Sequence, residues 1–236
     1  MPVFSARTSS TRLKNRPLLV RKSLVLACGL TYQTVSETRT VQISPNLSQP
    51  ANNPMPRLFV AIDLPDAHKA LLAALRDETL PARWTPPAQY HLTLRFIGEV
   101  DEARAATIEE TLATVRAYAF SLQGRGLDVF PSMRKPSVMF AAIDPAPALL
   151  DLQARIEDAL RPLSLDANAK PFHPHVTLAR LRRTAPRTVR AFLHTHASFT
   201  LAPFEVTHFH LYESLLRPEG ALHKRQAAFP LSEPNK

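Results

Sequence analysis

Two copies of one four-residue pattern, His-x-Thr-Leu, carry most of the chemistry that this sequence could perform. The copies occupy residues 91–94 and 175–178, so the two histidines are 84 positions apart. Imidazole titrates near pH 6.5, so one histidine can be neutral while another is protonated. Two histidines in one site could therefore serve as a general base and a general acid.

The two copies belong to a longer internal repeat. Residues 59–63 read Phe-Val-Ala-Ile-Asp and residues 140–144 read Phe-Ala-Ala-Ile-Asp, 81 positions apart. The same order of segments thus precedes each histidine. Two half-folds related by a pseudo-two-fold axis would bring His91 and His175 to opposite sides of one cleft.

Each histidine opens a run that is typical of a β-strand. Side chains alternate between the faces of a strand, so His91 shares a face with Thr93, and His175 with Thr177. Threonine hydroxyls can donate hydrogen bonds to phosphate oxygens. Two imidazoles and two hydroxyls around one site fit the hydrolysis of a phosphodiester, above all a strained cyclic phosphate, without a metal.

Hydrophobic periodicity predicts the order strand, helix, strand, helix, strand in each half. We expect strands over residues 57–62, 91–97 and 120–130, and again over 137–143 and 175–181. The expected apolar helix faces are Ala67, Leu71, Ala74 and Leu75; Ala105, Ile108, Leu112 and Val115; Leu149, Leu152, Ile156 and Leu160; and Val189, Phe192 and Leu193.

The predicted fold class is α+β, with two pseudo-symmetric lobes around a central groove. Each lobe is expected to be an antiparallel sheet with helices on its outer face. Asp63 and Asp144 lie where strands pass into helices, so we expect their carboxylates to cap the helices that follow. This capping interpretation is preferred to a pair of catalytic carboxylates.

The segments 57–63, 90–99 and 172–180 together resemble the two-histidine phosphoesterase superfamily, in particular its RNA 2′,3′-cyclic phosphodiesterases, historically called 2′-5′ RNA ligases. The resemblance spans residues 55–232. It implies hydrolysis of a terminal 2′,3′-cyclic phosphate to a 2′-phosphomonoester, with possible reverse joining of RNA ends through a 2′-5′ linkage.

The same resemblance implies a role for each site residue. His91 would donate a proton to the leaving 3′ oxygen, and His175 would accept a proton from water. Thr93, Thr177 and Arg180 would bind the phosphate. His223 departs from the family, which usually has an aromatic residue such as tyrosine there.

Two other functions compete with this one. A non-catalytic RNA-binding module of the same fold is disfavoured because both histidines and both threonines are present. A metal-dependent hydrolase would need the His-x-His pairs at 173/175, 194/196 and 208/210, but local spacing fixes no third ligand for any of them. The only cysteine is Cys28, which excludes a cysteine zinc site. We therefore expect neither a metal nor a cofactor.

Several other residues have both a functional and a structural interpretation. Arg95, Arg134, Lys135, Arg182 and Arg183 could follow an RNA backbone, although solvated surface charge is the simpler interpretation. Tyr90, Phe130 and Phe172 could stack on bases, although phenylalanines beside strands usually belong to the core. Trp84 lies in a proline-rich segment and favours neither interpretation.

The formal net charge of +9 is concentrated at one end. Residues 1–54 carry +6 and the remaining residues only +3. We expect residues 1–54 to be a disordered basic extension, or the product of a start codon assigned too early, and residues 55–236 to form the two-lobed domain.

A secretory signal is the alternative, but its apolar run over 23–28 is shorter than the ~7–15 residues required. No apolar stretch approaches the ~18 residues of a membrane span. The expectation is thus a cytoplasmic monomer whose partner is RNA.

Met55 directly precedes the first expected strand, so we predict that the functional protein starts there. An intact-mass measurement on native material should give the mass of residues 55–236. A mass that includes residues 1–54 would contradict this prediction.

Overall fold

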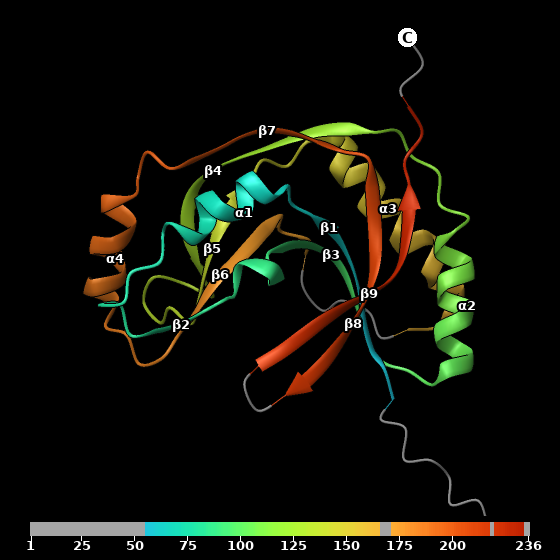
Figure 1. Cartoon of the computed structure of the whole chain (residues 1–236), viewed down its shortest axis with the longest axis horizontal. Helices are drawn as coiled ribbons and strands as arrows, with labels where there is room; N and C mark the ends of the chain where they lie inside the picture. Colours follow the sequence, from blue (N-terminus) through green and yellow to red (C-terminus); the bar gives the residue numbers. More distant parts are fainter. Residues whose placement is uncertain (1–54, 166–170, 218–219, 234–236) are drawn as a thin grey trace, which may run out of the picture. The chain divides into compact units, whose positions relative to one another are not determined.

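The computed structural model describes residues 55–165, 171–217 and 220–233, with only the backbone at 216, 217 and 220. The expectation for residues 1–54 lies outside the described residues. The first repeat contains β1 (Arg57–Asp63), α1 (Asp66–Ala73), β2 (Ala82–Trp84), the 3₁₀ helix η1 (Pro87–Gln89), β3 (His91–Glu99), α2 (Glu102–Leu112) and β4 (Phe120–Phe130). The second contains β5 (Val138–Ile143), α3 (Pro147–Leu160), η2 (Arg161–Leu163), β6 (His175–Leu181), α4 (Pro186–Thr195) and β7 (Thr200–Val206), followed by β8 (His208–Arg217) and β9 (Gly220–Pro230) (Figure 1).

The strand order of the sheet is symmetric about its centre. The strands run β7-β4-β5-β6-β3-β1-β8-β9, all paired antiparallel, and β2 pairs with β6 outside this path. If β3 is matched to β6 and β1 to β5, the order of strands is the same when counted outwards from the centre in either direction. The pseudo-two-fold axis therefore passes between β3 and β6, which meet at the pair Leu92–Val176. The α+β class and the two related half-sheets are confirmed, although the half-sheets join into one sheet.

The two sequence repeats do not coincide with the two half-sheets. β4 closes the first repeat but pairs with β5 and β7 of the second repeat. In return, β8 comes from the end of the chain and pairs with β1 of the first repeat. Each half-sheet thus contains strands from both parts of the chain. The half-sheets are therefore linked by the chain itself as well as by the pairing of β3 with β6.

The strand pairing beside each histidine does not match the positions that repeat in the sequence. Asp63 pairs with His91, whereas the residue that pairs with His175 is Ala142, not Asp144. The echo at residues 59–63 and 140–144 is therefore displaced by two residues against the histidine motifs. Two residues are one full period of a strand, so the echoed side chains keep the same face. Phe59 accordingly lies against His91, and Phe140 lies against His175.

Three of the four predicted helix faces are confirmed. α3 buries Leu149, Leu152, Ile156 and Leu160 and packs against α2, β3 and β4. The face predicted for α1 is wrong, because Ala67, Leu71 and Ala74 are exposed while Leu72 is fully buried. α1 packs against η1 and β7, and this contact, rather than the longest apolar stripe, decides which face is buried. Within the described residues no helix has the length and hydropathy needed to cross a bilayer.

The predicted capping roles of the two aspartates are also wrong. α1 begins after Pro65 and α3 after Ala146, and neither has a side-chain cap. Asp63 instead accepts a hydrogen bond from the Tyr212 hydroxyl at 2.6 Å. Asp144 accepts hydrogen bonds from Gln123 and Arg125 on β4. Each carboxylate thus fastens neighbouring strands rather than a helix end.

Two adjacent leucines of α3 provide a matched test of this packing. Leu149 is fully buried, whereas Leu150 is 42% exposed on the same helix turn. We expect Leu149→Ala to lower the free energy of unfolding by about 2–5 kcal/mol, because it leaves a cavity under the sheet. Leu150→Ala should change it by less than about 0.5 kcal/mol. Urea unfolding of both variants measures this, and equal losses would contradict the assigned face.

Candidate active site

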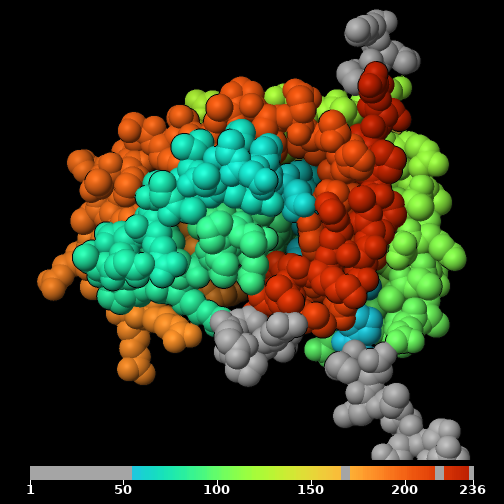
Figure 2. All heavy atoms as spheres, in the orientation of Figure 1, coloured from blue at the N-terminus to red at the C-terminus, as the bar shows by residue number. Residues whose placement is uncertain are grey.

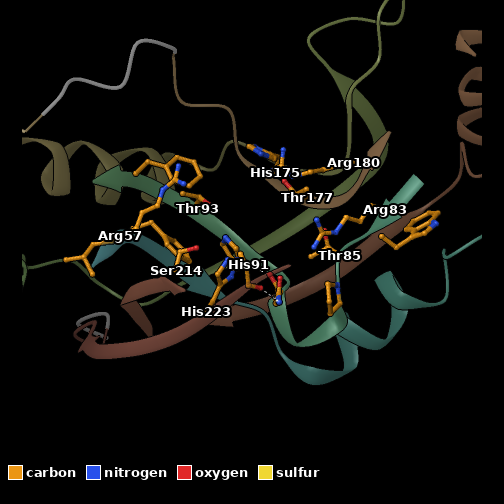
Figure 3. Close-up of a pocket in the computed structure, with 17 residues that line it drawn as sticks. Arg57, Arg83, Thr85, His91, Thr93, His175, Thr177, Arg180, Ser214 and His223 are labelled. Carbon is orange, nitrogen blue, oxygen red and sulfur yellow. Dashed lines mark hydrogen bonds between the residues drawn. The ribbon is translucent and has the colours of Figure 1, made fainter. Parts of the chain in front are cut away.

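A pocket of about 450 Å³ lies where β3 and β6 meet. It is lined by both His-x-Thr motifs, by residues of β1 and β2, and by the β8–β9 hairpin (Figure 3). This hairpin, red in Figure 2, lies beside the segment that contains η1, and the Gln89 side-chain amide donates to the Ala221 carbonyl. One wall of the pocket is therefore supplied by the last strands of the chain.

The two histidines are oriented by the same backbone contact. Nδ1 of His91 lies 2.7 Å from the carbonyl oxygen of Gln89, two residues earlier. Nδ1 of His175 lies 2.6 Å from the carbonyl oxygen of His173, again two residues earlier. A carbonyl only accepts, so each Nδ1 carries the proton, and each Nε2 is left to exchange a proton in the pocket.

The strand register brings the two motifs together. Leu92 pairs with Val176 in an antiparallel arrangement, which sets His91 opposite Thr177 and His175 opposite Thr93. All four side chains line the pocket, whereas Leu92 and Val176 are buried on the other face. The two imidazoles are diagonal neighbours across the strand pair, a separation of about 7–8 Å at the backbone. The structure thus places the four predicted motif residues around one space.

A bulge in each central strand adds a further side chain to the pocket. Thr93 pairs with Ala61 and Arg95 with Val60, which leaves Leu94 as an extra residue. Leu178 is the extra residue of β6 in the same way. Each bulge reverses the alternation, so the fifth residue after each histidine lines the pocket: Phe96 in β3 and Arg180 in β6. Arg180, which was predicted to bind the phosphate, thus lines the pocket, although simple alternation would have turned it away.

Aromatic rings pack around both imidazoles, but the two sets differ. The His175 ring contacts Phe130 and Phe140 edge-on, with centroid distances of 5.0 and 5.2 Å. The His91 ring contacts Phe59 and His223, both at 4.9 Å. His175 therefore lies among phenyl rings with the His173 imidazole farther away, at 6.3 Å, while His91 has the His223 imidazole in closer contact.

Burial makes both histidines harder to protonate. It lowers the pKa of His91 to about 4, with a smaller contribution from the charge of His223, while the Gln89 carbonyl and Asp63 act in the opposite direction. Burial also lowers the pKa of His175, partly offset by the His173 carbonyl. At neutral pH both imidazoles of the free protein are therefore neutral.

The charged side chains that line the pocket are basic. Arg57, Arg83 and Arg180 lie along it, and none of its described lining residues is acidic (Figure 3). Arg83 of β2 pairs with Arg180 of β6, which brings two guanidinium-bearing residues to one end. Such a lining favours an anionic ligand. A bound anion would also make the two histidines easier to protonate.

The other histidines do not gather into a metal site. Within the described residues, no three or more His, Cys, Asp and Glu side chains lie close enough together to hold a metal ion. The His208 and His210 rings stack at 6.1 Å, and His210 is buried, with 7% of its surface exposed. His210 packs beside Asp63, with Nε2 and Oδ2 3.9 Å apart.

Several residues with two interpretations can now be placed. Arg95 is buried and forms an ion pair with Glu157 of α3, so it does not face an RNA backbone. Tyr90 belongs to the core. Trp84 lines the pocket and donates from Nε1 to the Asp77 carbonyl at 3.2 Å.

Sequence reasoning missed part of the pocket lining. The missed residues include Arg57, Arg83, Thr85, Phe96 and Ser214. Only Phe96 had a signal in the sequence, since it stands five residues after its histidine, as Arg180 does. The others lie on β1, β2 and β8 or directly after β2, and only the tertiary pairing brings them to the pocket.

Comparison with known proteins agrees with this arrangement. A protein of Aeropyrum pernix named RNA 2′,3′-cyclic phosphodiesterase is 34% identical over 160 residues, which cover 65% of this chain and 90% of that protein. A protein of the same name from Thermus thermophilus is 33% identical over 186 residues, 74% of this chain and 90% of that protein.

The fold has solved counterparts as well. The crystal structure of the Thermus thermophilus protein TT0787 superposes with a TM-score of 0.63 and 29% identity, covering 76% of this chain and all of that one. The family model of the 2′-5′ RNA ligase superfamily matches residues 64–217, which include both histidine motifs and the strands that carry them. The chain therefore belongs to the 2′-5′ RNA ligase superfamily.

Proposed function

We propose that this protein hydrolyses RNA 2′,3′-cyclic phosphate ends to 2′-phosphomonoesters by histidine acid–base catalysis, and that it can join RNA ends reversibly through a 2′-5′ linkage. The observation that carries the proposal is the pair of imidazoles held by equivalent carbonyls in one basic pocket. Membership of the superfamily and the names of the relatives support the same reaction.

On the attacking side, His175 is the proposed base. Its Nδ1 proton is engaged by the His173 carbonyl, so Nε2 has a free lone pair directed to the pocket. A water held there gives its proton to Nε2 while its oxygen forms a bond to phosphorus. The lowered pKa of His175 keeps this nitrogen unprotonated at neutral pH.

On the leaving side, His91 is the proposed acid. As the bond from phosphorus to the 3′ oxygen breaks, that oxygen takes the Nε2 proton of His91. The proton must first be loaded, and the anionic substrate favours this because a negative charge stabilises imidazolium. Water thus supplies hydroxide to phosphorus and a proton to the enzyme, and the enzyme returns one proton to the product.

Thr93, Thr177 and Arg180 are the proposed phosphate ligands. Each threonine stands opposite the histidine of the other strand, so a phosphate between the imidazoles meets a hydroxyl from either side. Arg180 adds a cation at the edge of the same space. Charge-assisted hydrogen bonds of this kind stabilise the additional negative charge of the transition state.

The molecular context of the reaction stays a prediction. We propose that residues 55–236 are the functional unit, that residues 1–54 are a basic extension, and that the protein acts as a monomer in the cytoplasm. A non-catalytic RNA-binding role remains the competing function, and the pocket lining alone would serve either one.

Removing either imidazole separates these functions. We expect His91→Ala and His175→Ala each to lower kcat/KM for a 2′,3′-cyclic nucleotide by about 10²–10⁴-fold, because each removes one proton-transfer step. The matched control is His208→Ala, which removes an exposed imidazole outside the pocket and should leave the rate unchanged. All assays contain a chelator. Loss of wild-type activity on chelation would indicate a metal-dependent reaction, and no activity in any condition would leave binding as the function.

The pH dependence tests the proposed pair as such. A reaction with one acid and one base gives a bell-shaped profile of kcat/KM, whose limbs follow the groups of the free protein. Because burial lowers the pKa of both histidines, we expect the maximum to lie below about pH 6.5, the value of an unperturbed imidazole. Measuring kcat/KM from pH 4 to pH 9 tests this. A profile with a single limb, or a maximum above pH 8, would contradict it.

A further inference from the structure

A third imidazole, that of His223, lies in the pocket beside His91. His223 comes from β9 and reaches the site because it pairs with Ser214 of β8, which lines the same pocket. Its ring meets the His91 ring edge-on, with a centroid distance of 4.9 Å and an interplanar angle of 77°. It lies equally close, 4.9 Å, to Phe59. Figure 3 shows the two imidazoles, from β3 and β9, side by side.

The hydrogen bonding of the two imidazoles is unequal. Nδ1 of His91 donates to the Gln89 carbonyl, whereas Nδ1 of His223 is buried and has no hydrogen-bond partner among the described residues. His91 is also the more deeply buried of the two rings. The Gln89 carbonyl favours a proton on His91, but the deeper burial of that ring outweighs it. As the pH falls, His223 is therefore the ring that gains a proton at the lower cost. Once it is charged, it repels a second proton at this distance.

Other charged groups around the pair do not replace this effect. From β1, Asp63 favours a proton on His91, while Arg57 lies farther along the pocket. From β6, Arg180 adds positive charge, as Arg83 does from β2, and His175 adds it only once it is protonated. From β8, the Tyr212 hydroxyl is held neutral by burial and its bond to Asp63, which raise its pKa. From β9, Arg225 stands 3.8 Å from Asp63 and offsets that carboxylate. Of the rings packed against His91, those of Phe59, Tyr212 and His223, the His223 imidazole is the one that can carry a positive charge.

We propose that His223 takes up a proton before His91 does and, through its charge, delays proton uptake by His91, so that it sets the pH range in which His91 can donate. His223 is a positioning residue in this scheme, since it acts through His91 and not on the phosphate. The inference rests on the proposed function, because the proton of His91 matters to catalysis only if His91 is the donor.

Two consequences distinguish this role from simple packing. The proton uptake of His91 should depend on whether residue 223 can carry charge, and not on the volume of its side chain. The alkaline limb of the kcat/KM profile, which follows the protonated donor, should move with it. If the ring at position 223 were merely structural, its replacement would alter stability or KM. The His91 titration and the alkaline limb of kcat/KM would then stay unchanged.

The experiment is an NMR titration of the histidine ring protons in the full-length wild type and in His223→Phe and His223→Gln. The His91 resonance is assigned by its loss in His91→Ala. Phe keeps a ring of similar size without charge, and Gln keeps polarity without charge. We expect the midpoint of the His91 titration to rise by about one pH unit in both variants. The alkaline limb of kcat/KM should move in the same direction and by a similar amount.

The control is His208→Gln, which removes an imidazole that stacks on His210 and has no ring contact with His91. It should leave the His91 titration unchanged. An unchanged or lowered His91 midpoint in the Phe and Gln variants would overturn the proposal. So would a rise with Gln alone, since that would report hydration rather than charge. The titration needs no turnover, so it tests the coupling even if the proposed reaction is absent.

Discussion

The pocket depends on two hydrogen bonds from imidazoles to backbone carbonyls. In both motifs the acceptor is the peptide oxygen two residues before the histidine, just outside the strand that the histidine begins. Because this oxygen precedes the ladder, it is available to a side chain. The chain before each histidine is stiffened by proline: Pro87 opens η1, and Pro174 directly precedes His175. The carbonyls are therefore held in place, and each ring can present only its Nε2 to the pocket.

The packing that fixes these rings also makes them poor at holding a proton. The pKa of about 4 for His91 corresponds to a cost of about 3 kcal/mol for protonation relative to a free imidazole. One negative charge about 4 Å away returns roughly 4 kcal/mol at an effective dielectric constant of 20. The two quantities are of the same size, so a bound phosphate is able to favour a proton on His91, the proposed donor, which an empty pocket leaves neutral. This explains why a pocket whose histidines have lowered pKa values would also be lined by arginines, which attract the phosphate.

The sequence predicted the elements of this site better than their connections. The strands over residues 120–130 and 175–181 were predicted to the residue, and the shared face of each histidine and threonine followed from strand alternation alone. The bulges at Leu94 and Leu178 could not be read from the sequence, because an extra residue exists only relative to a partner strand. The exchange of β4 and β8 between the half-sheets was hidden for the same reason. The α1 face was mispredicted since three of its apolar residues turn to solvent.

A duplicated scaffold with a pseudo-two-fold axis does not by itself distinguish an acid from a base. Both halves supply a histidine, a threonine, a carbonyl and a bulge in the same order. The difference lies in what pairs beside each histidine: Asp63 stands next to His91, whereas the matching position next to His175 is Ala142. A carboxylate favours a protonated imidazole, and phenyl rings favour a neutral one. Asp63 therefore favours a proton on His91, although burial, the larger effect, still lowers its pKa to about 4. At His175, Phe130 and Phe140 favour the neutral form. The proposed assignment of His91 as the donor thus draws its support from Asp63, which breaks the symmetry between the two halves.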